Sequence, residues 1–396
     1  MTFTTYPKQN QKVDYDTIVI GAGIMGSCTA YQLAKKGRKT LLLEQFSYGH
    51  KKGSSHGASR IIRYAHSSPI YMPLADGAYR EWDELSRLTG TKLYDACGLL
   101  WLGDENGTRT RSELLAKYGV QHRVFHGQEI NKNFPYLKYG DEWHAVHDTK
   151  AGVIFADKCI EAAQKQFLAY GGTIHYSETV LAIKPLDNNI IEIYTNNHKY
   201  TCRSLVVTAG AWLNRLFPEI GTRTEPTLVG VNFWKITSNY ELFKTENKSP
   251  VLIITELDDE MFSIPNVDHP GMIKFGVHAG VPLDMVNSNR PEPPKWTYTI
   301  PGKHIKEHLK YIDSSDPAIK ESCVYTVTDD QDFIIDRHPI FRNIVIGGGF
   351  SGTGFKFGAI VGDILARMAL DEDVSDFDLK PFSANRKVDP FHKAKL

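Results

Sequence analysis

A short β-branched strand that runs directly into a glycine-rich turn and a helix is the feature that most restricts the fold of this chain. Residues 16–20 predict the strand, Gly21, Gly23 and Gly26 mark the turn, and residues 24–36 have helical periodicity. The first glycine permits the tight turn, the second lets backbone amides approach a pyrophosphate, and the third lets helix and strand pack closely. The helix N-terminus adds unpaired N–H groups and the positive end of a dipole. This order predicts a dinucleotide-binding unit.

An acidic residue stands where a dinucleotide site needs one. Residues 39–43 predict a second strand, and Glu44 follows it, 18 residues after Gly26. A carboxylate there binds ribose hydroxyls and repels a 2′-phosphate. The motif does not separate FAD from NAD.

Composition excludes several classes of protein. The 396 residues suffice for two domains, and 46 basic side chains balance 46 acidic ones. This balance argues against a nucleic-acid-binding protein, and no apolar run approaches the roughly 20 residues that cross a bilayer. The five cysteines form no Cys-x-x-Cys pair, so they suggest neither a cysteine zinc site nor a disulfide framework, and we expect a reducing compartment and no bound metal.

Later segments of the chain are predicted to add helices and strands to the nucleotide-binding part. Residues 151–172 predict a helix, 173–180 a strand, and 205–208 a buried strand. Near the end, residues 344–346 predict a strand that opens into a glycine-rich loop and a helix over 356–370.

A different pattern interrupts these segments. Residues 228–236, 251–257, 261–265 and 272–278 predict strands of a mixed or antiparallel sheet. The expected fold class is therefore α/β, with a discontinuous Rossmann-like domain and a second, sheet-based substrate domain. The predicted boundaries are 1–90, 150–225 and 323–396 for the nucleotide-binding domain, and 91–149 and 226–322 for the substrate domain. We expect the active site at their junction.

Further motifs carry a resemblance to a known family, and they occur in order between about residues 16 and 382. They are the loop 54–63 (SSHGASRIIR), the segments 151–155 (AGVIF) and 206–212 (VVTAGAW), Cys323–Thr326 with 332–339 (DFIIDRHP), and the loop 349–357 (GFSGTGFKF). With the glycine motif, this set resembles the monomeric sarcosine oxidase family, and is most similar to its peroxisomal sarcosine oxidase/L-pipecolate oxidase branch. The resemblance implies the fold of FAD-dependent amino-acid oxidases. It also implies oxidation of a secondary-amine amino acid to an imine that hydrolyses, with O2 reduced to H2O2.

The resemblance places cations in a substrate pocket. Arg63 and Lys356 are expected to bind the substrate carboxylate, because an unpaired charge in an enclosed pocket is costly. Phe262 is expected to line the same pocket, where relatives often have a tyrosine. Thr353 replaces a histidine often found in the glycine-rich loop. These two departures leave the preferred amine open among sarcosine, L-pipecolate, other N-methylated amino acids and related cyclic imino acids.

Two cations are expected to act near the flavin ring, and two histidines are expected as polar groups of the pocket. Lys274 matches the lysine that the family uses for oxygen activation, and Arg60 adds a second cation close to the ring. His278 lies four residues after Lys274, so strand alternation predicts that both side chains point to one face. His278 and His56 are expected to orient substrate or tune charge.

The cofactor is expected to be FAD, bound covalently through a thioether at Cys323. The other positions that the resemblance assigns to cofactor binding join the glycine motif and Glu44; they are Ser55, Val180, Gly352 and Phe355.

Three rival functions stay open. A fructosyl-amino-acid oxidase shares the fold and the covalent flavin, but its cysteine usually has a tryptophan neighbour, where this chain has Val324 and Tyr325. A dehydrogenase passes its electrons to a carrier, so it would not need Lys274 for oxygen activation. A flavin-binding protein without catalysis would not need Arg63, Lys356, Lys274 and Cys323 together.

The C-terminal residues Ala394, Lys395 and Leu396 match the pattern of a peroxisomal address. Peroxide production makes that location sensible. We therefore expect a peroxisomal protein whose C-terminus is read by an import receptor. The family resemblance implies an amino-acid substrate, O2 and a monomer, and the composition predicts no nucleic-acid or membrane partner.

Overall fold

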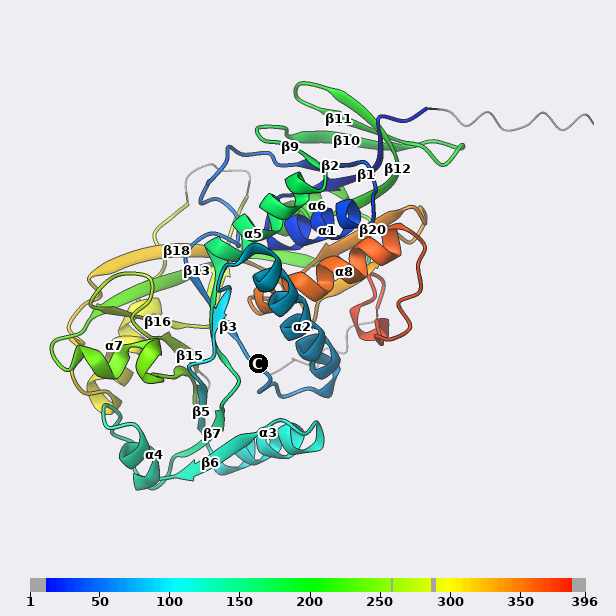
Figure 1. The fold of residues 1–396 in the computed structure, drawn as a ribbon. Helices are drawn as coiled ribbons and strands as arrows, with labels where there is room; N and C mark the ends of the chain where they lie inside the picture. The colour runs from blue at the N-terminus through cyan, green and yellow to red at the C-terminus, as the bar shows by residue number, and fades with distance from the viewer. Residues whose placement is uncertain (1–11, 258, 286–289, 387–396) are drawn as a thin grey trace, which may run out of the picture.

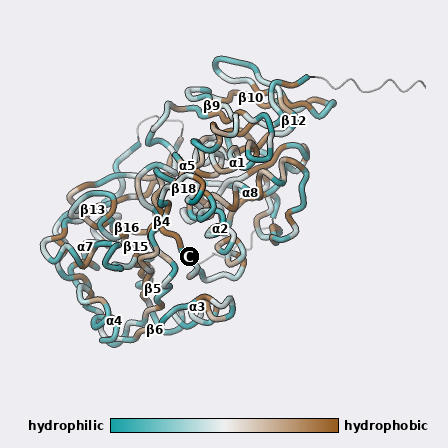
Figure 2. Tube along the Cα trace, viewed as in Figure 1, coloured by the Kyte–Doolittle hydropathy of each residue, from teal (hydrophilic) through white to brown (hydrophobic). Residues whose placement is uncertain are grey.

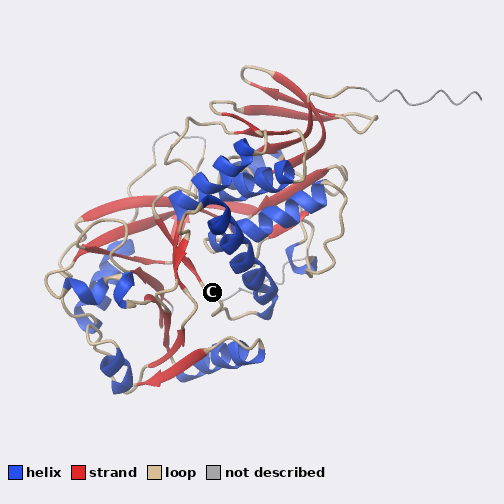
Figure 3. Cartoon of the chain, in the orientation of Figure 1, coloured by secondary structure: helices blue, strands red, loops and turns tan. Residues whose placement is uncertain are grey.

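Two large β-sheets, each with its own helices, organise the chain in a computed structural model that describes residues 12–257, 259–285 and 290–386 (Figure 1). The predicted address at Ala394, Lys395 and Leu396 lies outside the described residues. The predicted α/β fold class is confirmed, with the sheet of the nucleotide-binding part and the sheet of the second part lying next to one another (Figure 3).

The first sheet has a parallel core. Its eight strands are β1 (Tyr15–Ile20), β2 (Thr40–Leu43), β9 (Thr173–His175), β10 (Val180–Pro185), β11 (Ile191–Thr195), β12 (Lys199–Val207), β19 (Ile334–Arg337) and β20 (Ile344–Gly348). Strand β1 pairs in parallel with β2 on one side and β12 on the other, and β12 pairs in parallel with β20. Segments far apart in sequence thus complete one sheet.

Both faces of the parallel core, which consists of β1, β2, the end of β12 and β20, are buried, and this explains the continuous apolar runs of these strands. Val19 and Val206 contact the cluster formed with helices α1 (Ile24–Lys35), α2 (Met72–Thr89), α5 (Ala156–Ala169) and α8 (Gly358–Ala369). Ile18 and Leu205, on the opposite face, pack with the short helix α6 (Leu213–Leu216) and with β11.

The second sheet is mixed and mostly antiparallel. Its nine strands are β5 (Leu99–Gly103), β6 (His122–His126), β7 (His144–Asp148), β13 (Thr224–Lys235), β14 (Val251–Glu256), β15 (Asp259–Ile264), β16 (Met272–Val277), β17 (Gly280–Pro282) and β18 (Ile319–Thr328). Helices α3 (Glu105–Lys117), α4 (Gln128–Asn133) and α7 (Trp296–His308) border it. Hydrophilic colouring dominates α4 at the periphery (Figure 2).

A small third sheet corrects one sequence-based prediction. It contains β3 (Ser59–Ile62), β4 (Tyr94–Asp95) and β8 (Gly152–Phe155), in the order β3-β8-β4. The helix predicted from residue 151 was wrong over its first five residues, and α5 begins at Ala156. Val153 and Ile154 suit a strand and pair antiparallel with β3, so tertiary pairing prevails over helical periodicity here.

The predicted domain boundaries stay a prediction. The boundary at residue 323 falls inside β18, which pairs with β13 over its whole length in the second sheet.

Within the described residues, no helix combines the length and apolar character required to span a bilayer.

Candidate active site

A cavity of about 460 Å³ opens at the N-terminus of α1 and extends toward the junction of the two parts. Residues 20–25 and Glu44 line one region of it, and Gly352 and Phe355 line another. Ser55 and Val180, which the sequence placed at the cofactor, also line its wall. The volume falls in the range of small-molecule and cofactor sites.

The glycine turn is shaped for a close approach to a ligand. Gly21 has φ +96°, and a Cβ at Gly26 would lie 1.8 Å from the Gly21 carbonyl oxygen, so neither position tolerates a side chain. No side chain caps the N-terminus of α1 at Gly23, although the Ile24 amide donates to Ser55 Oγ at 3.1 Å. The helix therefore presents its positive end to the cavity, as phosphate binding requires.

Glu44 is held as a carboxylate at the end of β2. Its Oε2 accepts from the Ala22 amide at 2.9 Å and its Oε1 from the Phe46 amide at 3.0 Å. Burial raises the pKa of Glu44, but the hydrogen bonds from His50, Ala22 and Phe46 outweigh it and leave the pKa below its ordinary value. With the turn and the uncapped helix, this carboxylate fits a dinucleotide with free ribose hydroxyls.

A second cavity of about 120 Å³ adjoins the first. Six residues line both cavities, and they are His56, Gly57, Arg60, Tyr325, Gly352 and Phe355. The second cavity is also lined by Arg63, Phe262, Lys274, His278, Cys323 and Lys356, so the structure brings the sequence-predicted substrate and catalytic residues together at one place.

Arg63 is a buried cation with an unused donor. It follows β3, is 3% exposed, and lies over the Trp101 ring with its Cζ 4.8 Å from the ring centroid. Burial lowers the pKa of Arg63 to about 10, which still leaves it charged near neutral pH. Its Nη1 is buried and has no hydrogen-bond partner among the residues that the structure describes. Such a nitrogen needs an anionic or carbonyl partner to offset the cost of burial.

Lys356 adds a second cation and Glu260 an anion. Lys356 is buried in the short 3₁₀ turn before α8, and its Nζ donates to the Thr353 carbonyl at 2.6 Å. Burial and then the charge of Arg63 place its pKa well below the ordinary value. Glu260 lines the same cavity from β15, and burial raises its pKa against the opposing effect of Arg63. The sequence did not point to Glu260, because only strand pairing turns it toward these cations.

Lys274 lies in a buried ion pair. Its Nζ donates to Asp268 Oδ1 at 2.9 Å and to Ser59 Oγ at 2.7 Å, and both charged side chains are almost fully buried. Burial lowers the pKa of Lys274 despite the raising effect of Asp268. Burial alone would raise the pKa of Asp268. The charge of Lys274 and the hydrogen bond from Ser59 outweigh this effect, so the pKa of Asp268 lies below its ordinary value. The sequence missed Asp268, which lies in the loop between β15 and β16 without a motif of its own.

The remaining predicted residues occupy the boundary between the cavities. Arg60 donates to the carbonyls of Ser59, Ser54 and His56, so its guanidinium holds the loop together. A Cβ at Gly352, where φ is +78°, would lie 2.4 Å from the Tyr325 ring, so a side chain at this position would collide with the cavity wall.

Cys323 is buried on β18, next to this boundary. Its Sγ lies 3.8 Å from the Ser54 carbonyl oxygen, and all five cysteines of the chain are free and buried. Cys323 is the cysteine that lines the second cavity, whereas neither cavity is lined by Cys28, Cys97, Cys159 or Cys202.

The two cavity histidines predict a pH dependence of stability. Burial lowers the pKa of His278 to about 3 and that of His56 to about 4, so the unfolded chain binds protons below about pH 6.5 that the folded chain does not. The free energy of unfolding should therefore fall as pH drops from 6 to 5, by up to about 1.4 kcal/mol per pH unit for each histidine. We expect His278→Gln to reduce this slope in chemical denaturation. An unchanged slope would contradict the neutral, buried state of His278.

Comparison with known proteins places the chain in a family. The family described as "FAD dependent oxidoreductase" matches residues 16–368. A Caenorhabditis elegans protein named "Putative sarcosine oxidase" is 38% identical over 94% of this chain and 98% of its own length. The human "Peroxisomal sarcosine oxidase" is 34% identical over 95% of this chain and 97% of its own length.

Solved structures agree on the fold. The Tyr258Phe mutant of NikD, an amino acid oxidase essential for nikkomycin biosynthesis, superposes with a TM-score of 0.81 at 20% identity, covering 93% of this chain and 96% of that one. The fold, the paired cavities and the matches over nearly the full length agree, and the chain therefore belongs to the FAD-dependent oxidoreductase family, as a relative of the sarcosine oxidases.

Proposed function

We propose that the chain oxidises a secondary-amine amino acid, such as sarcosine, L-pipecolate or another N-alkyl amino acid, to an imine with reduction of O2 to H2O2. The observation that carries this proposal is the unpartnered Arg63 Nη1 in a small cavity that adjoins the dinucleotide cavity. The names of the relatives support the class of substrate.

The glycine turn, Glu44 and Ser55 would hold the dinucleotide part of FAD. When bound, FAD supplies the capacity to accept a hydride equivalent from the amine and to pass electrons to O2. The chain's own contribution is to bind and orient the amino acid and to supply charge where oxygen is reduced.

Arg63 would bind the substrate carboxylate, with the Lys356 ammonium as the second cation. A guanidinium can engage a carboxylate through two parallel hydrogen bonds, which fixes the orientation of the substrate as well as its position. Phe262 and Ile264 line the same cavity and would exclude water from the amine. Phe262 offers no hydroxyl, which favours an apolar N-substituent or ring.

Lys274 would stabilise negative charge that develops on oxygen. It is buried and donates to Asp268 and Ser59, so its ammonium is already oriented before oxygen arrives. A preorganised charge in a dry site needs little reorganisation during the reaction.

The proposed activity is tested by measuring peroxide release by the purified, flavin-loaded protein. Sarcosine, L-pipecolate and a fructosyl amino acid would be compared with N-methylethylamine, which lacks the carboxylate. We expect peroxide with at least one of the first two and far less with N-methylethylamine. A preference for the fructosyl amino acid would favour the rival oxidase, and no peroxide with any amine would overturn the proposed activity.

Covalent attachment through Cys323 is part of the proposal, supported by its place in the second cavity. We expect flavin to remain with acid-precipitated wild-type protein and to be released from Cys323→Ser. Cys97→Ser is a matched control, since its buried Sγ also lies 3.8 Å from a carbonyl oxygen. Flavin that remains bound in acid-precipitated Cys323→Ser would place the bond elsewhere.

A peroxisomal location and a monomeric state complete the proposal. The name of the human relative supports the location. Imaging of a fusion with a fluorescent protein at the N-terminus tests the peroxisomal location. Light scattering after size-exclusion chromatography tests the monomeric state. Diffuse fluorescence or the mass of a dimer would contradict them.

A further inference from the structure

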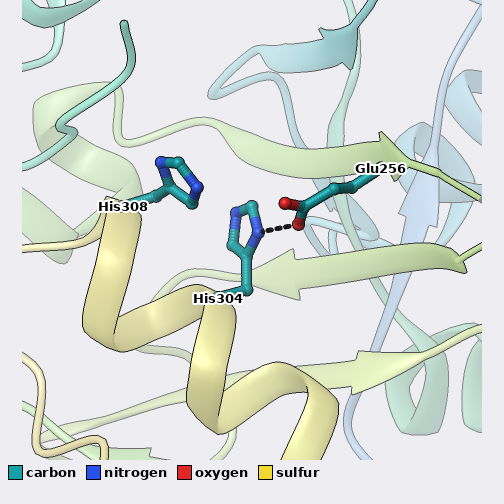
Figure 4. A group of neighbouring side chains, drawn as sticks. All are labelled: Glu256, His304 and His308. Atoms are coloured by element: carbon teal, nitrogen blue, oxygen red, sulfur yellow. Dashed lines mark hydrogen bonds and ion pairs between the residues drawn. The ribbon is translucent and has the colours of Figure 1, made fainter.

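Two histidines and a glutamate converge where α7 meets the end of a strand of the second sheet. His304 and His308 lie one turn apart on α7, and Glu256 ends β14 (Figure 4). One nitrogen or oxygen atom from each of the three side chains lies within 4.8 Å of the others. None of the three lines either cavity, so the cluster has no part in the proposed oxidation.

The histidine spacing suits a shared ligand. Residues four apart on a helix project from one face, and the two imidazole centroids lie 4.6 Å apart. Glu256 reaches this face from a neighbouring strand, and its Oε2 lies 2.7 Å from His304 Nδ1. Two imidazoles and one carboxylate form a donor set that binds Zn²⁺ with a fourth position left for water.

Outer hydrogen bonds already orient both rings. His308 Nδ1 lies 3.2 Å from the Lys138 carbonyl oxygen, which can only accept, so the lone pair of Nε2 stays available. His304 Nδ1 donates its proton to Glu256 in the absence of an ion; when an ion binds, the proton moves to Nε2, which lies 2.9 Å from the Tyr139 hydroxyl that can accept it, and Nδ1 becomes free for the ion. Metal-binding histidines are typically held by such partners on the opposite nitrogen.

We propose that Glu256, His304 and His308 form a binding site for a divalent transition-metal ion of the Zn²⁺ type. The ion takes the place of the hydrogen bond between His304 and Glu256, and each of these residues binds it instead. His308 supplies the third protein ligand, and a water molecule occupies the fourth coordination position. The site ties α7 to the end of β14, which pairs with β15 in the sheet that also carries Lys274. Zinc therefore stabilises the second part of the molecule without entering the reaction.

The test is a calorimetric titration of chelator-treated, flavin-loaded protein with ZnCl2, followed by thermal unfolding with and without Zn²⁺. We expect one Zn²⁺ per chain and a higher Tm with ZnCl2 than with MgCl2, because Mg²⁺ prefers oxygen ligands in an octahedron. Glu256→Gln and His308→Asn should each weaken binding at least ten-fold and remove the Tm shift. Both side chains are partly exposed, so these variants disturb the core less than a substitution of buried His304.

His144→Asn is the matched control. His126 and His144 form another histidine pair, with ring centroids 4.5 Å apart, but no carboxylate among the described residues completes a three-ligand group with them. This variant should bind Zn²⁺ as the wild type does. Absence of binding in the wild type would overturn the proposal, and so would equal affinity in the wild type, Glu256→Gln and His308→Asn. Neither outcome bears on peroxide production, which tests the proposed oxidation separately.

Discussion

Lys274→Met is expected to slow reoxidation of the reduced enzyme by O2 by about 10²–10³-fold, the range for loss of one preorganised charge or donor. Reduction of the enzyme by the amine should change far less, because Lys274 is paired with Asp268 and Ser59, whereas Arg63 and Lys356 offer the carboxylate-binding charges. Stopped-flow absorbance of the flavin separates the two half-reactions. Equal slowing of both would contradict a role for Lys274 in oxygen reduction.

The effect of Lys274→Met on O2 reactivity must be distinguished from a loss of folding stability. Removing Lys274 leaves Asp268 buried without its cation, and breaking a buried ion pair typically costs about 3–5 kcal/mol. The double variant Lys274→Met/Asp268→Asn removes both charges and should recover much of that stability while O2 reactivity stays low. Lys320→Met, which removes an exposed lysine on β18 paired with Asp316, should change neither property.

Arg63→Ala is expected to reduce kcat/KM for carboxylate-bearing amines by about 30- to 5,000-fold, equivalent to about 2–5 kcal/mol for loss of one partner of a buried charge pair. Most of the effect should lie in KM, because the interaction holds the substrate in the ground state and the transition state alike. Steady-state peroxide assays with sarcosine and L-pipecolate measure this loss.

An amine without a carboxylate is the substrate control for Arg63. N-methylethylamine should be a poor substrate of the wild type, and Arg63→Ala should not impair its oxidation further. Arg80→Ala removes an exposed arginine paired with Asp76 on α2 and should leave all constants unchanged. An unchanged KM for sarcosine and L-pipecolate in Arg63→Ala would remove Arg63 from the substrate pocket.

The nucleotide-binding strand, turn and helix could be predicted from sequence because their signals are local. Strand β1, the glycines at 21, 23 and 26, and helix α1 occupy consecutive positions, and the turn geometry depends on residue type there. Of the nine strands of the second sheet, β13, β14, β15 and β16 were likewise predicted within a few residues of their ends, whereas β5, β6, β7, β17 and β18 were not predicted. Residues 151–155 were predicted as helix because their strand character depends on pairing with β3, which is remote in sequence.

Some residues of the candidate site could likewise be predicted from the sequence, and others could not. Motif resemblance named Arg63, Lys274, Cys323 and Lys356, and the fold brings all four to one cavity. Asp268 was missed because its partnership with Lys274 depends on the path of a loop that carries no motif.

Residue type at short spacing was enough to predict the order of elements and the dinucleotide motif, and resemblance to a family named the candidate cations. The burial of particular charges together appears only in the folded chain; it includes the ion pair of Lys274 with Asp268, the approach of Glu260 to Arg63, and the meeting of Glu256 with two histidines about 50 residues later. Burial, pairing and pKa depend on groups that the fold brings close, and the spacing of residues along the chain does not encode those distances.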